Sequence, residues 1–128
     1  MLNNKDYCDY ETSITLGELG FTLDMTEKVY ERNLMTSRYE TIPKPLLYEA
    51  QKWLREEKDI HIEVYACAGG YIYELCKAYK PNSFSGGTTI YTPNDVDNPK
   101  LNDAGRYDDF EMCLSEGIKE AVKILKEK

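Results

Sequence analysis

The chain has 128 residues, which fits a single domain whose core needs neither disulfides nor a structural metal. Its 16 basic and 23 acidic residues give a formal net charge of −7, and the basic residues are scattered along the chain. We therefore expect no direct binding of nucleic acid, which needs a basic patch. The acidic surface is expected to keep the protein soluble, with attraction of a basic partner as the alternative.

The beginning of the chain has no apolar stretch like that of a signal peptide, and no apolar run approaches the length of a membrane span. The sequence therefore predicts a cytoplasmic protein without a membrane partner. The four cysteines are far apart and form no C-x-x-C pair, so we expect reduced, partly buried thiols at Cys8, Cys67, Cys76 and Cys113. Eleven tyrosines are unusual, and we expect most of them in strands and at rims, with an aromatic binding surface as the alternative.

The N-terminal part of the chain shows the weakest patterns. Residues 1–12 are polar and predict a loose segment. A short helix is predicted from Ser13 to Leu19, with Ser13 as its cap, Gly20 as its end and Phe21 docked on the core. Residues 28–33 then predict a short edge strand.

The clearest helix is predicted over residues 45–57. Pro45 suits the first turn of a helix, because its missing N–H costs little there. Apolar residues recur at helical spacing and form one face, made of Leu46, Leu47, Ala50, Trp53 and Leu54. We expect Trp53 to anchor the core rather than to stack on a ligand.

A hairpin is predicted after this helix, because apolar and polar residues alternate from residue 60 onward. Gly69 and Gly70 predict a two-residue turn, which places Val64 opposite Leu75. Residues 88–92 predict a third strand. Residues 93–106 predict a long loop that is either mobile or binds a partner.

A final helix is predicted over residues 109–126, with Asp108 and Glu111 as a capping pair. Gly117 in this helix would allow close packing on the sheet. The elements together predict a single α+β domain over residues 1–128. Its core from residue 43 onward has the order α-β-β-β-α, a small, mainly antiparallel sheet with two helices packed on one face.

His61 is the only histidine, and on a strand it would share a face with Glu63, Tyr65 and Cys67. Such a cluster could bind zinc, but its spacing does not match a zinc finger, so we expect a structural or exposed histidine. The glycine-rich stretch of residues 83–89 lacks the lysine of a P-loop, and the acids of residues 94–109 lack the EF-hand spacing. We therefore predict no catalytic residue, no metal ligand and no cofactor.

Two stretches carry a resemblance to a known family, namely AQKWLREEKDIHIEVY (Ala50–Tyr65) and FEMCLSEGIKEAVKIL (Phe110–Leu125). Together with the glycine-tyrosine hairpin between them, they resemble small phage-related proteins of Bacteroides-type gut bacteria. This resemblance implies a phage or prophage setting and no particular activity. The order of elements also resembles the double-stranded-RNA-binding-domain topology, and the run Tyr107–Leu114 resembles the last helix of HicB-type antitoxins in shape.

The sequence therefore favours a non-enzymatic protein that binds a protein partner or forms a homo-oligomer. The predicted interaction surface consists of His61, Glu63, Tyr65, Tyr71 and Tyr73. One alternative is an acidic inhibitor of a host defence or nucleic-acid enzyme, which predicts that acids cluster in one patch. The other is a small enzyme that uses His61 with Glu63 or Glu74, which requires a pocket beside His61.

Overall fold

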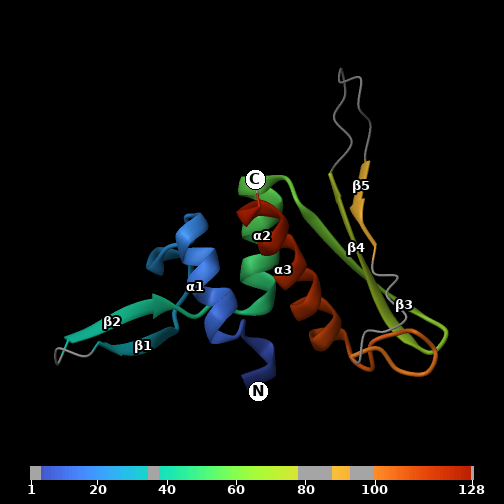
Figure 1. Ribbon diagram of the computed structural model, residues 1–128, viewed down its shortest axis with the longest axis horizontal. Coiled ribbons are helices and arrows are strands. Elements are labelled where there is room, and N and C mark those ends of the chain that lie inside the picture. Colours follow the sequence, from blue (N-terminus) through green and yellow to red (C-terminus); the bar gives the residue numbers. More distant parts are fainter. Residues whose placement is uncertain (1–3, 35–37, 78–87, 93–99, 128) are drawn as a thin grey trace.

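The computed structural model describes residues 4–34, 38–77, 88–92 and 100–127. In these ranges three α-helices lie between a two-stranded and a three-stranded antiparallel sheet, which confirms the α+β class (Figure 1). The elements in chain order are η1 (Asn4–Asp6), α1 (Tyr10–Leu19), η2 (Leu23–Met25), β1 (Val29–Leu34), β2 (Arg38–Pro43), α2 (Leu47–Lys58), β3 (His61–Cys67), β4 (Gly70–Lys77), β5 (Thr88–Tyr91) and α3 (Phe110–Lys126). None of these helices is long and apolar enough to cross a membrane.

The α-β-β-β-α core predicted from residue 43 onward is formed by α2, β3, β4, β5 and α3. Helix α3 packs against β3 and β4, and α2 packs against α3 and β3. The side chains that fill the space between these elements are almost fully buried, including Leu54, Ile62, Leu75, Leu114 and Ile118. Removal of this apolar surface from water is the main force that holds the helices on the sheet.

The N-terminal segment is folded from residue 4 onward and joins the core at Cys8, so the prediction of a loose segment fails for residues 4–12. Cys8 is 1% exposed, and its N–H donates to the Pro45 carbonyl at 2.9 Å. Helix α1 begins at Tyr10 rather than at Ser13, because Asp9 is its cap and accepts the Thr12 N–H at 2.8 Å. Gly20 ends this helix with a φ of +118°, and Phe21 is buried, as predicted.

The starts of α2 and α3 differ from the predicted ones. Pro45 precedes α2 instead of lying in its first turn, and Leu46 occupies the cap position, where its N–H donates to Glu49 Oε1 at 2.7 Å. The predicted apolar face of α2 is confirmed by the burial of Leu47, Ala50, Trp53 and Leu54. Helix α3 is capped by Asp109, whose carboxylate accepts the Met112 N–H at 2.7 Å, so the predicted Asp108–Glu111 pair is wrong.

The turn of the β3–β4 hairpin lies at Ala68 and Gly69, one residue earlier than predicted. Val64 therefore pairs with Tyr73 rather than with Leu75. Because side chains alternate between faces with a period of two, this shift of two residues leaves every side chain on its predicted face. Gly69 has a φ of +94°, which glycine adopts without the steric cost of a side chain.

The predicted strand over residues 28–33 is confirmed as β1, but its partner β2 was not predicted. The two strands form a separate hairpin that extends away from the helices (Figure 1). Its base is attached to the N-terminal segment, since the Tyr30 hydroxyl donates to the Cys8 carbonyl at 2.7 Å. Lys44 Nζ lies 4.8 Å from the ring centroid of Tyr7 and 4.9 Å from that of Tyr30, which adds a cation–π contact on each ring.

The loop predicted over residues 93–106 is docked on the hairpin in its described part. Residues 93–99, like most of the glycine-rich stretch 83–89, lie outside the described residues. Tyr107 exchanges two backbone hydrogen bonds of 2.9 Å with Tyr71 of β4. The Asn102 amide donates to the Gly69 carbonyl at 2.9 Å, so the loop holds the tip of the hairpin.

Candidate functional site

The five predicted interaction residues do not form one surface. Gly117 of α3 lies against Ile62 and Tyr73. The face of the sheet that carries Ile62 and Tyr73 is therefore the face that the helix covers. By alternation, Tyr71 shares this covered face, whereas His61, Glu63 and Tyr65 lie on the opposite, outer face.

Tyr73 is part of the core. It is 3% exposed, and its ring stacks near those of Tyr107 and Tyr91 at centroid distances of 6.0 and 6.2 Å. Burial raises the pKa of Tyr73 above its ordinary value, and the neighbouring phenols Tyr107 and Tyr91 add to the increase. Tyr71 is half-buried and lies edge-on to Phe110. Of the tyrosines in the predicted set, only Tyr65, which is 46% exposed, faces solvent.

His61 is held in a structural pairing. Its Nε2 lies 3.4 Å from Oδ1 of Asp59, the residue that ends α2 in the left-handed conformation with a φ of +54°. Glu74 is engaged elsewhere, because its carboxylate accepts the Thr89 hydroxyl at 2.8 Å. Within the described ranges, no three or more His, Cys, Asp or Glu side chains gather in a way that could hold a metal ion.

Four surface hollows formed by described residues lie away from His61. The enzyme alternative requires a pocket beside this histidine, and these hollows do not supply one. One of them is crossed by ion pairs, since Lys119 lies 3.2 Å from Asp9 and 3.8 Å from Glu116, and Glu116 also pairs with Lys100. These ion pairs connect α1, α3 and the loop before α3, and each of the four side chains has an oppositely charged partner within the group.

The four cysteines are free thiols, as predicted. Cys8 and Cys113 are buried, and burial raises the pKa of Cys113 to about 12. Cys67 is partly exposed, and its sulfur accepts the Nε–H of Arg106 at 2.8 Å. This contact attaches the loop before α3 to the end of β3.

The outer edge of β3, meaning the edge that faces away from β4, is the first candidate interaction surface. In an antiparallel pair, each residue points its N–H and C=O toward the same neighbour, and the direction alternates along the strand. The N–H and C=O of Tyr71 both bond to Tyr107, so they point away from β3. Ala66, which pairs with Tyr71 across the hairpin, therefore points its own N–H and C=O away from β4. By the same alternation, Val64 and Ile62 also point outward.

Only part of this edge is covered. The Ile62 carbonyl accepts the Gln51 amide of α2 at 2.8 Å. Among the residues that the structure describes, no strand pairs with the outer edge of β3. Toward the described residues, the backbone groups of Val64 and Ala66 therefore form an open edge beside the exposed side chain of Tyr65.

A groove beside α2 is the second candidate surface, and the sequence analysis did not identify it. It is a hollow of about 350 Å³ lined by Phe21, Met25, Tyr48, Glu49, Lys52, Trp53, Glu56 and Glu57. Tyr48 is 62% exposed, although the other two aromatic residues that line this hollow, Phe21 and Trp53, are buried. The signal in the sequence is that Tyr48 lies outside the apolar stripe of α2, next to Glu49 and about two turns before Glu56.

Comparison of the chain with family models, curated proteins and solved structures found no match. The function is therefore inferred from the two surfaces themselves.

Proposed function

We propose that the protein is a non-enzymatic binding module that associates with a second copy of itself through the outer edge of β3. The observation that carries this proposal is the open edge formed by the backbone of Val64 and Ala66. Exposed edges usually carry lysine, proline or a bulge that prevents pairing with another chain. Between Ile62 and Cys67, β3 contains neither lysine nor proline, and its one charge is Glu63.

An antiparallel pairing with a two-fold axis at Tyr65 uses only the open part of this edge. Val64 then faces Ala66 of the second copy, and each pair exchanges two backbone hydrogen bonds. The two Tyr65 rings meet as a non-hydrogen-bonded cross-strand pair, the arrangement that brings side chains closest. Glu63 lies opposite Cys67 of the second copy, so no like charges face each other.

The expected strength of this pairing is modest. Each backbone hydrogen bond contributes about 0.5–1.5 kcal/mol net, and a cross-strand aromatic pair contributes about 0.2–1 kcal/mol. Association also costs several kcal/mol in lost freedom of motion. We therefore expect a weak dimer that forms at about millimolar concentration and, because hydrogen bonds and ring contacts dominate, resists salt.

The test is the mass in solution, measured by light scattering during size-exclusion chromatography at low and high salt. Loaded at about millimolar concentration, the wild-type protein should show a salt-resistant shift of its mass toward that of a dimer. Tyr65→Lys should run as a monomer, because it places two like charges opposite each other across the axis. Val29→Lys changes another exposed strand residue, 42% exposed, and should leave the dimer intact. A monomeric wild type, or equal dimerisation of both variants, would refute the proposal.

A phage or prophage setting and a cytoplasmic location belong to the same proposal. The setting is supported by the resemblance of residues 50–65 and 110–125 to small phage-related proteins. The location is supported by the four free thiols, which persist where the compartment is reducing.

A further inference from the structure

We propose that the groove beside α2 binds a basic amphipathic segment of a partner protein. An apolar side chain of that segment would enter the hollow, and its lysine or arginine residues would pair with the acids at the rim. Three independent features of the groove support this occupant: its exposed apolar residues, its charge and its aromatic floor.

Exposed apolar side chains gather at this groove. Met25 is 39% exposed and Tyr48 62%, and both line the hollow, while the neighbouring Leu23 is 46% exposed. Tyr48 also lines two further hollows, so it borders three hollows in all. Clustered exposed apolar residues beside a hollow are typical of a site that another molecule covers. The volume of about 350 Å³ is at the small end for a ligand pocket and suits one or two anchoring side chains.

The rim of the groove carries unused negative charge. Glu56 and Glu57 are exposed, and neither forms an ion pair within 4.0 Å in the described part of the chain. Glu49 has a structural role, because it accepts the Leu46 N–H and the Thr26 hydroxyl. Lys52 is the one basic residue among those that line the hollow.

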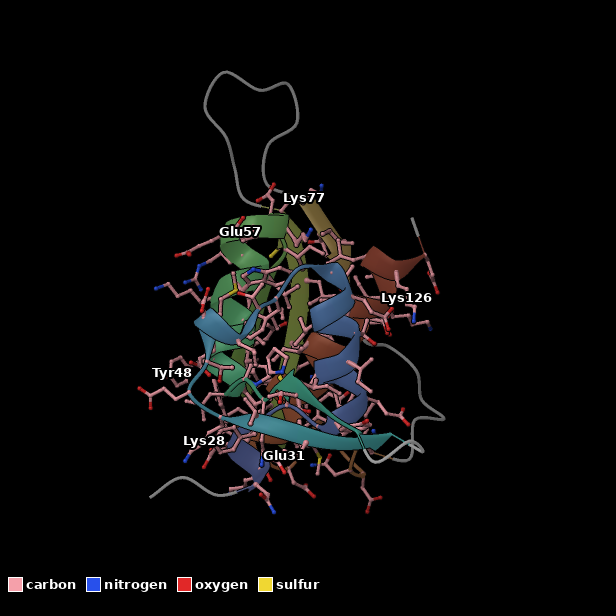
Figure 2. The ribbon with its side chains drawn as sticks, turned by 90° about the vertical axis from the view of Figure 1, so that its left-hand side faces the viewer. Lys28, Glu31, Tyr48, Glu57, Lys77 and Lys126 are labelled. Atoms are coloured by element: carbon pink, nitrogen blue, oxygen red, sulfur yellow. The ribbon has the colours of Figure 1, made fainter. Side chains whose placement is uncertain are left out.

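The charge also selects the kind of partner. A second copy of this chain would bring its own net charge of −7 to an acidic rim, whereas a basic segment would be attracted. In Figure 2, Tyr48 points away from the body, with Glu57 above it and Lys28 below it. Glu57 thus lies toward one end of the face around Tyr48 and Lys28 toward the other, which would orient a bound segment.

The aromatic floor suits a cation as well as an apolar group. Phe21 and Trp53 meet edge-on at a centroid distance of 5.7 Å beneath the hollow. Lys58 Nζ already lies 5.5 Å from the centroid of the Trp53 ring. The Trp53 ring thus already forms a cation–π contact with a lysine of the same chain. A lysine or arginine of the partner would form the same kind of contact with the ring of Tyr48.

Trp53 is the single tryptophan of the chain, so its fluorescence reports on this groove without a label. The probe is a synthetic helical peptide of leucine and lysine, with leucines at i, i+3, i+4 and i+7. Titration of the full chain with this peptide should change the Trp53 emission saturably. A peptide with glutamate in place of lysine, and one with serine in place of leucine, should each bind at least about tenfold more weakly.

Variants of the groove localise the binding. Tyr48→Ala and the double variant Glu56→Lys/Glu57→Lys should each weaken the affinity about tenfold or more. All three side chains are exposed, so the fold should be retained, as circular dichroism would verify. The matched control, Glu31→Lys/Glu127→Lys, makes the same change in net charge at exposed acids outside the groove and should bind like the wild type.

Several results would overturn this proposal. One is that the serine-substituted peptide binds as tightly as the leucine-lysine peptide, which would indicate attraction by charge alone. Another is that the control variant weakens binding as much as the groove variants do. The third is that the leucine-lysine peptide does not bind at all. A loss of dimer mass in Tyr48→Ala would also overturn it, because a second copy would then occupy the groove. The outcome is independent of the β3 edge, since Tyr65→Lys should bind the peptide like the wild type.

Discussion

Gly117 of α3 lies so close to Ile62 of β3 that a Cβ on the glycine would stand 2.7 Å from the Ile62 Cγ2 atom. Atoms at that distance overlap, so the contact between helix and sheet exists only because residue 117 has no side chain. The same position lies 3.4 Å from two atoms of the Tyr73 ring. The close packing predicted for Gly117 from the sequence is therefore confirmed, and its counterparts are now identified.

Gly117→Ala should destabilise the protein by up to about 2 kcal/mol. Alanine favours the helix by about 1 kcal/mol over glycine, but overpacking of a core costs about 1–3 kcal/mol, and the stiff, branched Ile62 side chain cannot easily move aside. Urea unfolding followed by circular dichroism measures the difference.

Gly17→Ala in α1 is the matched control for this substitution. In the described part of the chain, no atom outside its chain neighbours and the backbone of α1 lies within 4 Å of the position of its Cβ, so this variant should be up to about 1 kcal/mol more stable than the wild type. Equal effects of the two substitutions would contradict the close contact.

Asn102 organises the loop before α3, and its removal should loosen the tip of the β3–β4 hairpin. Its amide donates to the Gly69 carbonyl and to Asp108, and its side-chain oxygen accepts the N–H groups of Ala104 and Arg106. Asn102→Ala should cost about 1–3 kcal/mol, because several polar groups lose their partner at once. Amide hydrogen exchange should show faster exchange at Tyr71 and Tyr107.

Thr89→Ala serves as the control for Asn102→Ala. It removes one exposed hydrogen bond, to Glu74, and should change the stability by less than about 0.5 kcal/mol. If Asn102→Ala left the exchange at Tyr71 and Tyr107 unchanged, the loop would not be held by this side chain.

Asp9 should make a contribution to stability that depends on pH. Burial alone would raise its pKa, but the hydrogen bonds from Thr12 and the contact with Lys119 outweigh burial and hold the pKa below its ordinary value. A carboxyl whose pKa is lowered by folding stabilises the protein above the unfolded pKa of about 3.9. This stabilisation is lost as the pH falls through the lower, folded value.

Asp9→Asn isolates this charge, because asparagine caps a helix about as well as aspartate. The side chain is 51% exposed, so we expect a loss of only about 0.5 kcal/mol at pH 7. The loss should shrink as the pH falls below about 4. Thermal unfolding from pH 7 down to pH 2.5 measures it, and a difference that stays constant over this range would show that the charge has no role.

The patterns that repeat locally along the chain were sufficient to predict the apolar faces of α2 and β3. The apolar stripe of α2 follows from helical spacing, and the faces of β3 follow from alternation, so the burial of Leu54 and Ile62 could be predicted from neighbouring residues alone. Even the wrong turn position did not alter these faces, because a shift of two residues preserves the alternation.

Contacts between distant parts of the chain decided the rest. The first residues look loose in the sequence because Cys8 finds its hydrogen-bond partner only at Pro45. The loop before α3 has no periodicity in its sequence. Tyr107 pairs like a strand residue only because the fold brings its backbone beside Tyr71 of β4. The candidate sites are of the same kind. An open edge at Val64 and a hollow between Met25 and Tyr48 depend on what does and does not pack beside them, which no local pattern encodes.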